Sequence, residues 1–77
     1  MPKIPIIKSK DLLKLLLAYD CELIRINGSH HRLRNKSNGL FGTLPVHNKE
    51  QKKGMFVAIL RELGIDLNDF IDFIEKH

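Results

Sequence analysis

Two Asn-Gly pairs, at residues 27–28 and 38–39, constrain the fold of this 77-residue chain more than any other feature. Asn-Gly is typical of the tight turn of a β-hairpin, because glycine adopts a positive φ without steric cost. The segments around these turns predict three short strands, of which the first is rich in isoleucine and the last is ended by Pro45. Their ranges are 22–27, 30–35 and 40–44. The sequence therefore predicts a three-stranded antiparallel meander.

Helices are predicted before and after the meander, where apolar residues recur at intervals of three and four. The first runs from about residue 10 to 19, with Ser9 as its N-cap. The second begins at an Asn48 cap and ends at Gly64, where a C-terminal cap belongs. Gly54 lies inside it, and we expect this glycine to mark close packing or the close approach of a partner. The apolar positions are Leu12, Leu15, Leu16 and Tyr19, then Phe56, Ile59, Leu60 and Leu63.

A short acidic helix is predicted over residues 66–77, with Asp66 or Asn68 as its cap. Its apolar face consists of Leu67, Phe70, Ile71 and Ile74. Residues 1–8 contain two prolines and predict an extended lead-in. We expect residues 1–77 to form one α+β domain. Its α-β-β-β-α order places two helices on one face of the sheet and leaves the other face to solvent or to a ligand.

The composition is that of a globular protein, with 43% hydrophobic and 29% charged residues. The longest strongly apolar run, residues 15–18, is far too short to cross a bilayer, so we expect no membrane partner. The N-terminus lacks the apolar core of a secretory signal, and the single cysteine, Cys21, cannot form an internal disulfide. These features favour a cytoplasmic location.

Positive charge is concentrated in the first part of the chain. Residues 1–61 contain twelve Lys and Arg against four Asp and Glu, whereas residues 62–77 contain one lysine against five acids. The net charge of +4 therefore combines a basic body with an acidic tail. A basic body suits an anionic partner, nucleic acid above all, although a solvated lysine-rich surface has the same composition.

The run Gly-Ser-His-His at residues 28–31 is the most distinctive local feature. Glycine permits a tight turn or the close approach of a ligand, so Gly28 and Ser29 are candidate binding residues. Side chains alternate along a strand, so His30 and His31 are expected on opposite faces. Both histidines could instead be ordinary strand residues without a chemical role, and spacing alone favours that alternative.

Residues two apart on a strand share a face, so His30 is expected on the same face as Arg32 and Arg34. His31 is expected on the face of Leu33, which we expect to face the helices. Unless a bulge follows the turn, His30, Arg32 and Arg34 form one outward stripe. RNA supplies its own nucleophile, the 2′-hydroxyl. Its cleavage needs a base, an acid and cations for the charge that develops on the phosphate. Histidine, with an ordinary pKa near ~6.5, can act as base or acid, and arginine can hold the phosphate.

The segment that leads into the second helix is a further candidate for binding. His47 precedes the helix and could contact phosphate, or it could hold the corner between strand and helix by a hydrogen bond. Lysines crowd the first turns of this helix, whose free N–H groups also favour anions. They are Lys49, Lys52 and Lys53. A solvated helix face would show the same lysines.

No cofactor or metal is expected. Adjacent histidines on a strand diverge, so the run at residues 28–31 is a poor zinc ligand pair. The other candidate ligands are Cys21, His47 and His77, and their spacing matches no recognised zinc site. RNA cleavage through the 2′-hydroxyl requires no metal.

Taken together, these motifs resemble the HicA mRNA interferase toxins of the HicAB toxin–antitoxin systems, over about residues 6–68. The matching segments are Gly28-Ser29-His30-His31, Pro45-Val46-His47, Lys49-Glu50, Lys53-Gly54, Ile59-Leu60, Leu63-Gly64 and Lys8-Ser9-Lys10-Asp11-Leu12. The resemblance implies a double-stranded-RNA-binding-domain-like fold. It also implies an endoribonuclease that cleaves mRNA with a histidine of the Gly-Ser-His-His run. A HicB-type antitoxin that covers the site, in a hetero-oligomer with the toxin, is implied as well.

The resemblance leaves the catalytic residue open between His30 and His31, because the working histidine of the family takes either place. The chain departs from the family pattern at Asp20-Cys21, where a glycine is usual, at Met55, where a threonine is common, and in its long acidic extension. None of these departures touches the expected site. Two other functions fit the sequence: a non-catalytic double-stranded-RNA-binding module, and a protein-interaction module that docks through the apolar face of the last helix.

Overall fold

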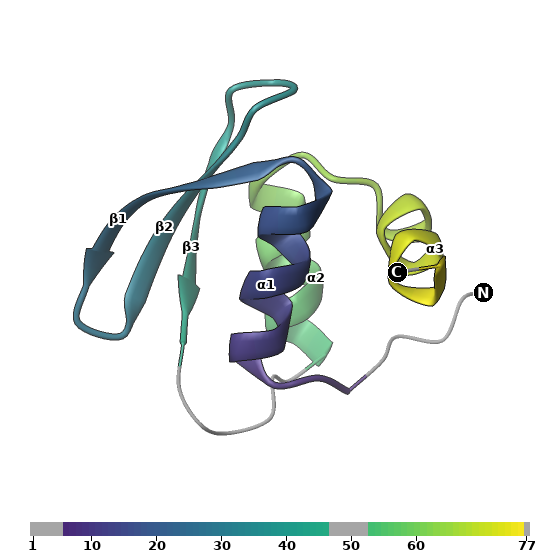
Figure 1. The fold of residues 1–77 in the computed structure, drawn as a ribbon, viewed down its shortest axis with the longest axis horizontal. Helices are drawn as coiled ribbons and strands as arrows, with labels where there is room; N and C mark the ends of the chain where they lie inside the picture. Colours follow the sequence, from purple (N-terminus) through teal and green to yellow (C-terminus); the bar gives the residue numbers. More distant parts are fainter. Residues whose placement is uncertain (1–5, 47–52, 77) are drawn as a thin grey trace.

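Three strands and three helices follow one another in the predicted order (Figure 1). The computed structural model describes residues 6–46 and 53–76. The elements are α1 (Ser9–Tyr19), β1 (Cys21–Asn27), β2 (His30–Asn35), β3 (Phe41–Pro45), α2 (Lys53–Glu62) and α3 (Leu67–Lys76). The α+β class and the α-β-β-β-α layout with a C-terminal helix are confirmed. Most of the predicted lead-in and the Asn48 cap lie outside the described residues.

The helix starts differ partly from prediction. Lys8 rather than Ser9 is the N-cap of α1, because its carbonyl accepts the first helical hydrogen bond from the Leu12 N–H at 2.9 Å. The prediction of a Ser9 cap is therefore wrong by one residue, and Ser9 lies buried in the first turn. Asp66, one of the two predicted caps, does cap α3: its Oδ1 accepts a hydrogen bond from the Asp69 N–H at 3.1 Å.

Gly64 terminates α2 as predicted, with a φ of +67°. Its N–H donates to the Arg61 carbonyl at 3.1 Å, and the Ile65 N–H donates to the Leu60 carbonyl at 2.8 Å. This pair of bonds is the Schellman arrangement, which requires a left-handed residue and therefore favours glycine. Ile65 and Leu60 are both buried, so the turn that follows α2 is anchored in the core.

The helices cover one face of the sheet. The strands lie in the order β1-β2-β3, and both neighbouring pairs are antiparallel. Helices α1 and α2 lie together on one side of the sheet, and α3 packs beyond them, away from the strands (Figure 1). We call the side of the sheet toward α1 and α2 the inward face and the opposite side the outward face. None of the described helices covers the outward face.

The core lies between the inward face and the helices. Its largest completely buried side chains are Phe56, Phe70, Leu12, Leu16, Leu33, Leu44, Leu60 and Leu63. Strand β3 and helix α2 come closest at Gly42, where an added Cβ would lie 2.9 Å from Ile59 Cδ1 and 3.1 Å from Leu63 Cγ. By contrast, a Cβ on Gly54 would meet no described atom within 4 Å. Among the described residues Gly54 therefore does not mark close packing, and Gly42 has that role; the close approach of a partner to Gly54 stays a prediction.

The apolar face of α3 packs against its own chain. Phe70 is completely buried, and its ring meets that of Tyr19 edge to face at 5.3 Å between centroids. Phe73 makes a similar contact with Tyr19 at 5.1 Å. Ile71 is buried too. Since its central side chains are already covered, this face does not offer the docking surface that an interaction module would need.

Cys21 begins β1 and points into the core, with 3% of its surface exposed. Burial raises the pKa of its thiol to about 11, because the thiolate would lose its hydration. The residue is therefore a neutral packing group at ordinary pH. Among residues 6–46 and 53–76, no helix combines the length and apolar character that crossing a membrane requires.

Candidate functional site

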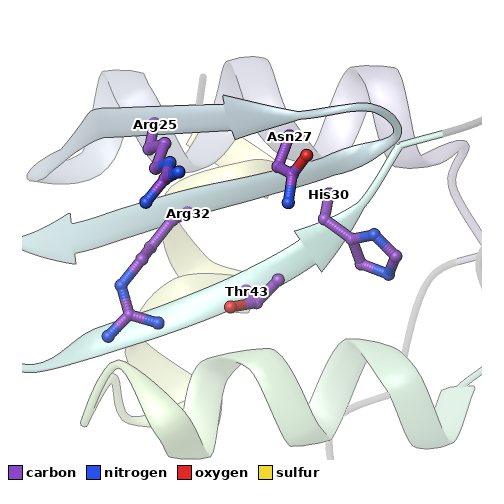
Figure 2. A pocket seen from close by; sticks show the side chains of 5 residues that line it. All are labelled: Arg25, Asn27, His30, Arg32 and Thr43. Atoms are coloured by element: carbon purple, nitrogen blue, oxygen red, sulfur yellow. The ribbon is translucent and has the colours of Figure 1, made fainter.

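The outward face of the sheet presents three rows of side chains that the strand pairing sets side by side. The rows are Asn27–His30–Pro45, Arg25–Arg32–Thr43 and Glu22–Arg34–Phe41, in the order β1, β2, β3. Five residues of the first two rows surround a shallow concavity of about 230 Å³ (Figure 2): Arg25, Asn27, His30, Arg32 and Thr43. The concavity therefore combines a titratable ring with two guanidinium groups.

The turn between β1 and β2 determines which histidine faces outward. Gly28 has a φ of +62°, and no described non-glycine residue has a positive φ, so glycine takes the first position of a two-residue turn. This is the signature of a type II′ hairpin. Asn27 pairs directly with His30, so no bulge follows Gly28. The predicted outward orientation of His30 is confirmed, and Leu33, completely buried, marks the inward face as expected.

A bulge does occur, but in β1. Leu23 pairs with Leu33 and Arg25 pairs with Arg32, so Ile24 is an extra residue without a partner. If β1 alternated strictly from Cys21, Arg25 would point inward. The bulge turns Arg25 and the residues after it, so that Arg25 joins the outward face. Arg25 was not among the predicted site residues, although an arginine at an inward position is itself a signal of a register shift, because burying its charge is costly.

His30 is exposed at the start of β2 (Figure 2). Within the described part of the chain, no hydrogen bond or ion pair holds its ring. Its backbone pairs with Asn27 of the neighbouring strand, and its side chain lines the concavity. A histidine in this position is accessible to a ligand on the outward face.

His31 has the opposite environment. It is half-buried on the inward face, between its strand partners Ile26 and Leu44. Its Nδ1 donates a hydrogen bond to the Ser29 carbonyl at 3.1 Å, and the same oxygen accepts the Val46 N–H at 2.7 Å. The carbonyl can only accept, so Nδ1 carries the proton. The Ser29 carbonyl thus joins the β1–β2 turn to the residue that follows β3, and the His31 ring holds that carbonyl from within the hairpin.

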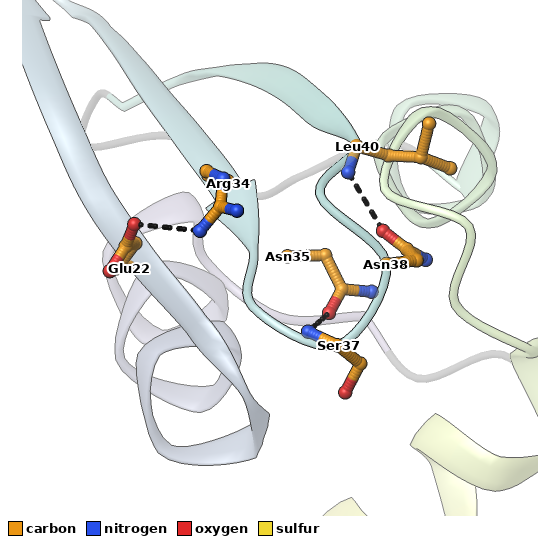
Figure 3. A network of polar contacts seen from close by, with 6 residues as sticks. All are labelled: Glu22, Arg34, Asn35, Ser37, Asn38 and Leu40. Atoms are coloured by element: carbon orange, nitrogen blue, oxygen red, sulfur yellow. Dashed lines mark hydrogen bonds and ion pairs between the residues drawn. The ribbon is translucent and has the colours of Figure 1, made fainter.

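The two predicted arginines of β2 differ in their contacts. Arg34 forms an ion pair with Glu22 of β1, with 3.2 Å between Nη1 and Oε1 (Figure 3). Arg32 instead lies over the Phe41 ring, with its Cζ 4.8 Å from the ring centroid. No carboxylate of the described residues pairs with Arg32. The charge of Arg34 is therefore partly neutralised within the sheet, whereas that of Arg32 is not.

The other end of the sheet is held by amide side chains (Figure 3). The Asn35 Nδ2, in a buried side chain, donates to the Leu63 carbonyl at 2.8 Å, and the Asn38 Nδ2 donates to the same oxygen at 3.0 Å. Asn35 Oδ1 accepts the Ser37 N–H at 3.0 Å, and Asn38 Oδ1 accepts the Leu40 N–H at 2.8 Å. These bonds join the β2–β3 turn to the end of α2.

The remaining candidates lie partly outside the described residues. Nothing is described for His47, Lys49 and Lys52, and α2 begins at Lys53. The start of α2 lies at the same end of the molecule as the β1–β2 turn (Figure 1). Among the described residues, no three His, Cys, Asp or Glu side chains are placed to hold a metal ion.

A family model described as "HicA toxin of bacterial toxin-antitoxin" matches residues 9–65. The chain belongs to the HicA toxin family. The matched region includes both faces of the sheet and ends just after Gly64, so α3 lies outside it. No curated protein and no solved structure matches the chain. Membership makes this protein a toxin of a toxin–antitoxin system and implies an antitoxin as its partner.

Proposed function

We propose that this HicA-family protein is a metal-independent endoribonuclease that cleaves mRNA, with His30 as its proton-transfer residue. The observation that supports the proposal most directly is the position of His30. Its ring is exposed on the uncovered face of the sheet, in one concavity with Arg25 and Arg32. Proton transfer and phosphate binding are the two tasks that cleavage of RNA requires of a protein.

The reaction would use the nucleophile that RNA contains. The 2′-hydroxyl oxygen forms a bond to the adjacent phosphorus and loses its proton to a base, while the bond from phosphorus to the 5′-oxygen breaks. The leaving oxygen takes a proton from an acid, so the products are a 2′,3′-cyclic phosphate and a 5′-hydroxyl. His30 can take either role, because histidine exchanges protons near neutral pH. Arg32 would stabilise the charge that develops on the phosphate.

His31 would act as a positioning residue. Its hydrogen bond to the Ser29 carbonyl holds the turn that precedes His30, and its half-buried ring faces away from the concavity. Gly28 and Ser29 would let the RNA backbone approach the turn closely. Arg34 would contribute less than Arg32, since Glu22 already neutralises part of its charge. His47, Lys49, Lys52 and Lys53 remain proposed RNA contacts.

The antitoxin partner would be of the HicB type and would cover the outward face, which would prevent RNA from reaching His30. The proposed substrate and a reduced, buried Cys21 both suit the cytoplasm. In this arrangement the toxin would be held in a hetero-oligomer until the antitoxin is removed.

The proposal is tested by incubating RNA in EDTA with the wild type, His30→Ala, His31→Ala and the double variant. We expect His30→Ala to slow cleavage by about 10²–10⁴-fold, the usual contribution of a general acid or base. His31→Ala should keep most of the activity and lose some stability. Urea unfolding of each variant controls for loss of structure.

Three outcomes would contradict the proposal. Cleavage that persists in the folded double variant would exclude a histidine mechanism at this site. Loss of cleavage in folded His31→Ala but not in His30→Ala would transfer the role to His31. Binding of double-stranded RNA by the wild type without any cleavage would support the non-catalytic binding module instead.

A further inference from the structure

Arg25 and Arg32 occupy directly opposed positions in neighbouring strands of the outward face. Like charges directly opposite each other destabilise a sheet, and an acid nearby would offset the repulsion. Glu22, the only acid in the three outward rows, is engaged by Arg34 one row away. Within the described residues, neither Arg25 nor Arg32 forms an ion pair with a carboxylate. The fold therefore places two arginines without a carboxylate partner at paired positions of neighbouring strands.

The surroundings of the pair favour a bound anion. Figure 2 shows the Arg25 side chain leaning from β1 toward β2, and Arg32 leaning from β2 across β3. Arg32 rests on the Phe41 ring, a contact that orients its guanidinium group. The Asn27 amide and the Thr43 hydroxyl line the same concavity and can donate further hydrogen bonds. Guanidinium groups match the oxygens of a phosphate in bidentate geometry.

We propose that Arg25 and Arg32 together bind one phosphate of the RNA backbone, next to the phosphate at which His30 acts. The inference rests on the proposed function. It adds Arg25, which reaches the site only because of the β1 bulge. Arg32 lies two residues beyond His30, which is about 7 Å along a strand. A nucleotide with its scissile bond at His30 can therefore place its neighbouring phosphate between the arginines.

The first test measures binding of a short single-stranded RNA at several salt concentrations. His30→Ala serves as the background, so that the RNA stays intact. Adding Arg25→Ala should weaken binding by about tenfold or more, because a hydrogen-bonded charge pair is lost. It should also lower the slope of log affinity against log salt by about 0.7–1, the value for one phosphate contact. Arg61→Ala is the matched control, since Arg61 is an exposed arginine of α2 outside the three rows.

The second test separates binding from structure without using RNA. In urea, Arg25→Ala should be at least as stable as the wild type, because the substitution removes a like-charge pair. Inorganic phosphate, added at constant ionic strength, should raise the Tm of the wild type more than that of Arg25→Ala. A purely structural role for Arg25 would give the reverse: lower stability and an equal response to phosphate.

The inference is overturned if Arg25→Ala binds RNA as tightly, and with the same salt slope, as Arg61→Ala. Failure of the proposed function would look different. In that case the wild type would not cleave RNA, or His30→Ala would cleave it normally, whatever the effect of Arg25→Ala on binding.

Discussion

The inward and outward faces of β2 have different environments, although their side chains alternate along the same six residues. Leu33 and Asn35, inward, are buried, and His31 beside them is held by a hydrogen bond. His30 and Arg32, outward, are exposed and have no acidic partner in the described structure. The difference shows that one strand can supply both the core and the site. Substitutions one residue apart should therefore separate stability from activity.

The largest contrast is expected between Leu33→Ala and Arg32→Ala. Leu33 is completely buried between the sheet and the helices, so its truncation should lower the free energy of unfolding by about 2–5 kcal/mol. Arg32→Ala removes only a surface contact with Phe41 and should change the free energy of unfolding by less than about 1 kcal/mol. Urea unfolding followed by circular dichroism measures both. Similar losses for the two variants would show that the faces do not divide stability from binding.

Cys21 is the first inward residue of β1, and its burial should make the stability of the protein depend on pH. The pKa of its thiol is about 11 in the folded state, against an ordinary value of 9.0, so the folded protein keeps the thiol proton up to a higher pH. The contribution of the buried thiol to the free energy of unfolding is complete below pH 9 and is lost as the pH rises toward 11. The loss amounts to at most about 3 kcal/mol. Unfolding of the wild type and Cys21→Ala across this range isolates the effect. Parallel pH profiles would argue against a buried thiol.

Gly42→Ala tests how closely the inward face approaches α2. The added methyl would meet Ile59 and Leu63 at or below contact distance, so we expect a loss of about 1–3 kcal/mol from overpacking. Gly54→Ala is the control, because nothing described lies within 4 Å of the new methyl group and alanine favours the helix. A neutral Gly42→Ala, measured by thermal unfolding, would mean that β3 and α2 can move apart at little cost.

The two adjacent histidines give the finest comparison. His31→Ala loses the hydrogen bond to the Ser29 carbonyl and should cost about 1 kcal/mol of stability. His30→Ala should stay within about 0.5 kcal/mol of the wild type, since its ring is exposed. Unfolding curves recorded in the same buffer resolve this difference. If His30→Ala were the less stable variant, the assignment of His31 as the positioning residue would fail.

Much of the fold could be predicted because its signals are local. The backbone has a positive φ at the turns and at the end of α2. This conformation favours glycine, so the glycines of the sequence indicate these positions. Apolar periodicity likewise predicted the helices and the inward position of Leu33. The Ser9 cap was misplaced because serine favours both the cap and the first turn, and only the hydrogen bond to Lys8 distinguishes them.

Within the site, the sequence by itself determined that His30 and Arg32 share a face, because a two-residue turn and strand alternation are properties of neighbouring residues. Only the tertiary structure decided the rest. The bulge that brings Arg25 outward, the ion pair of Arg34 with Glu22 and the contact of Gly42 with α2 each join residues distant in the chain. Such pairings depend on how strands and helices bury their surfaces against one another, which no local pattern contains.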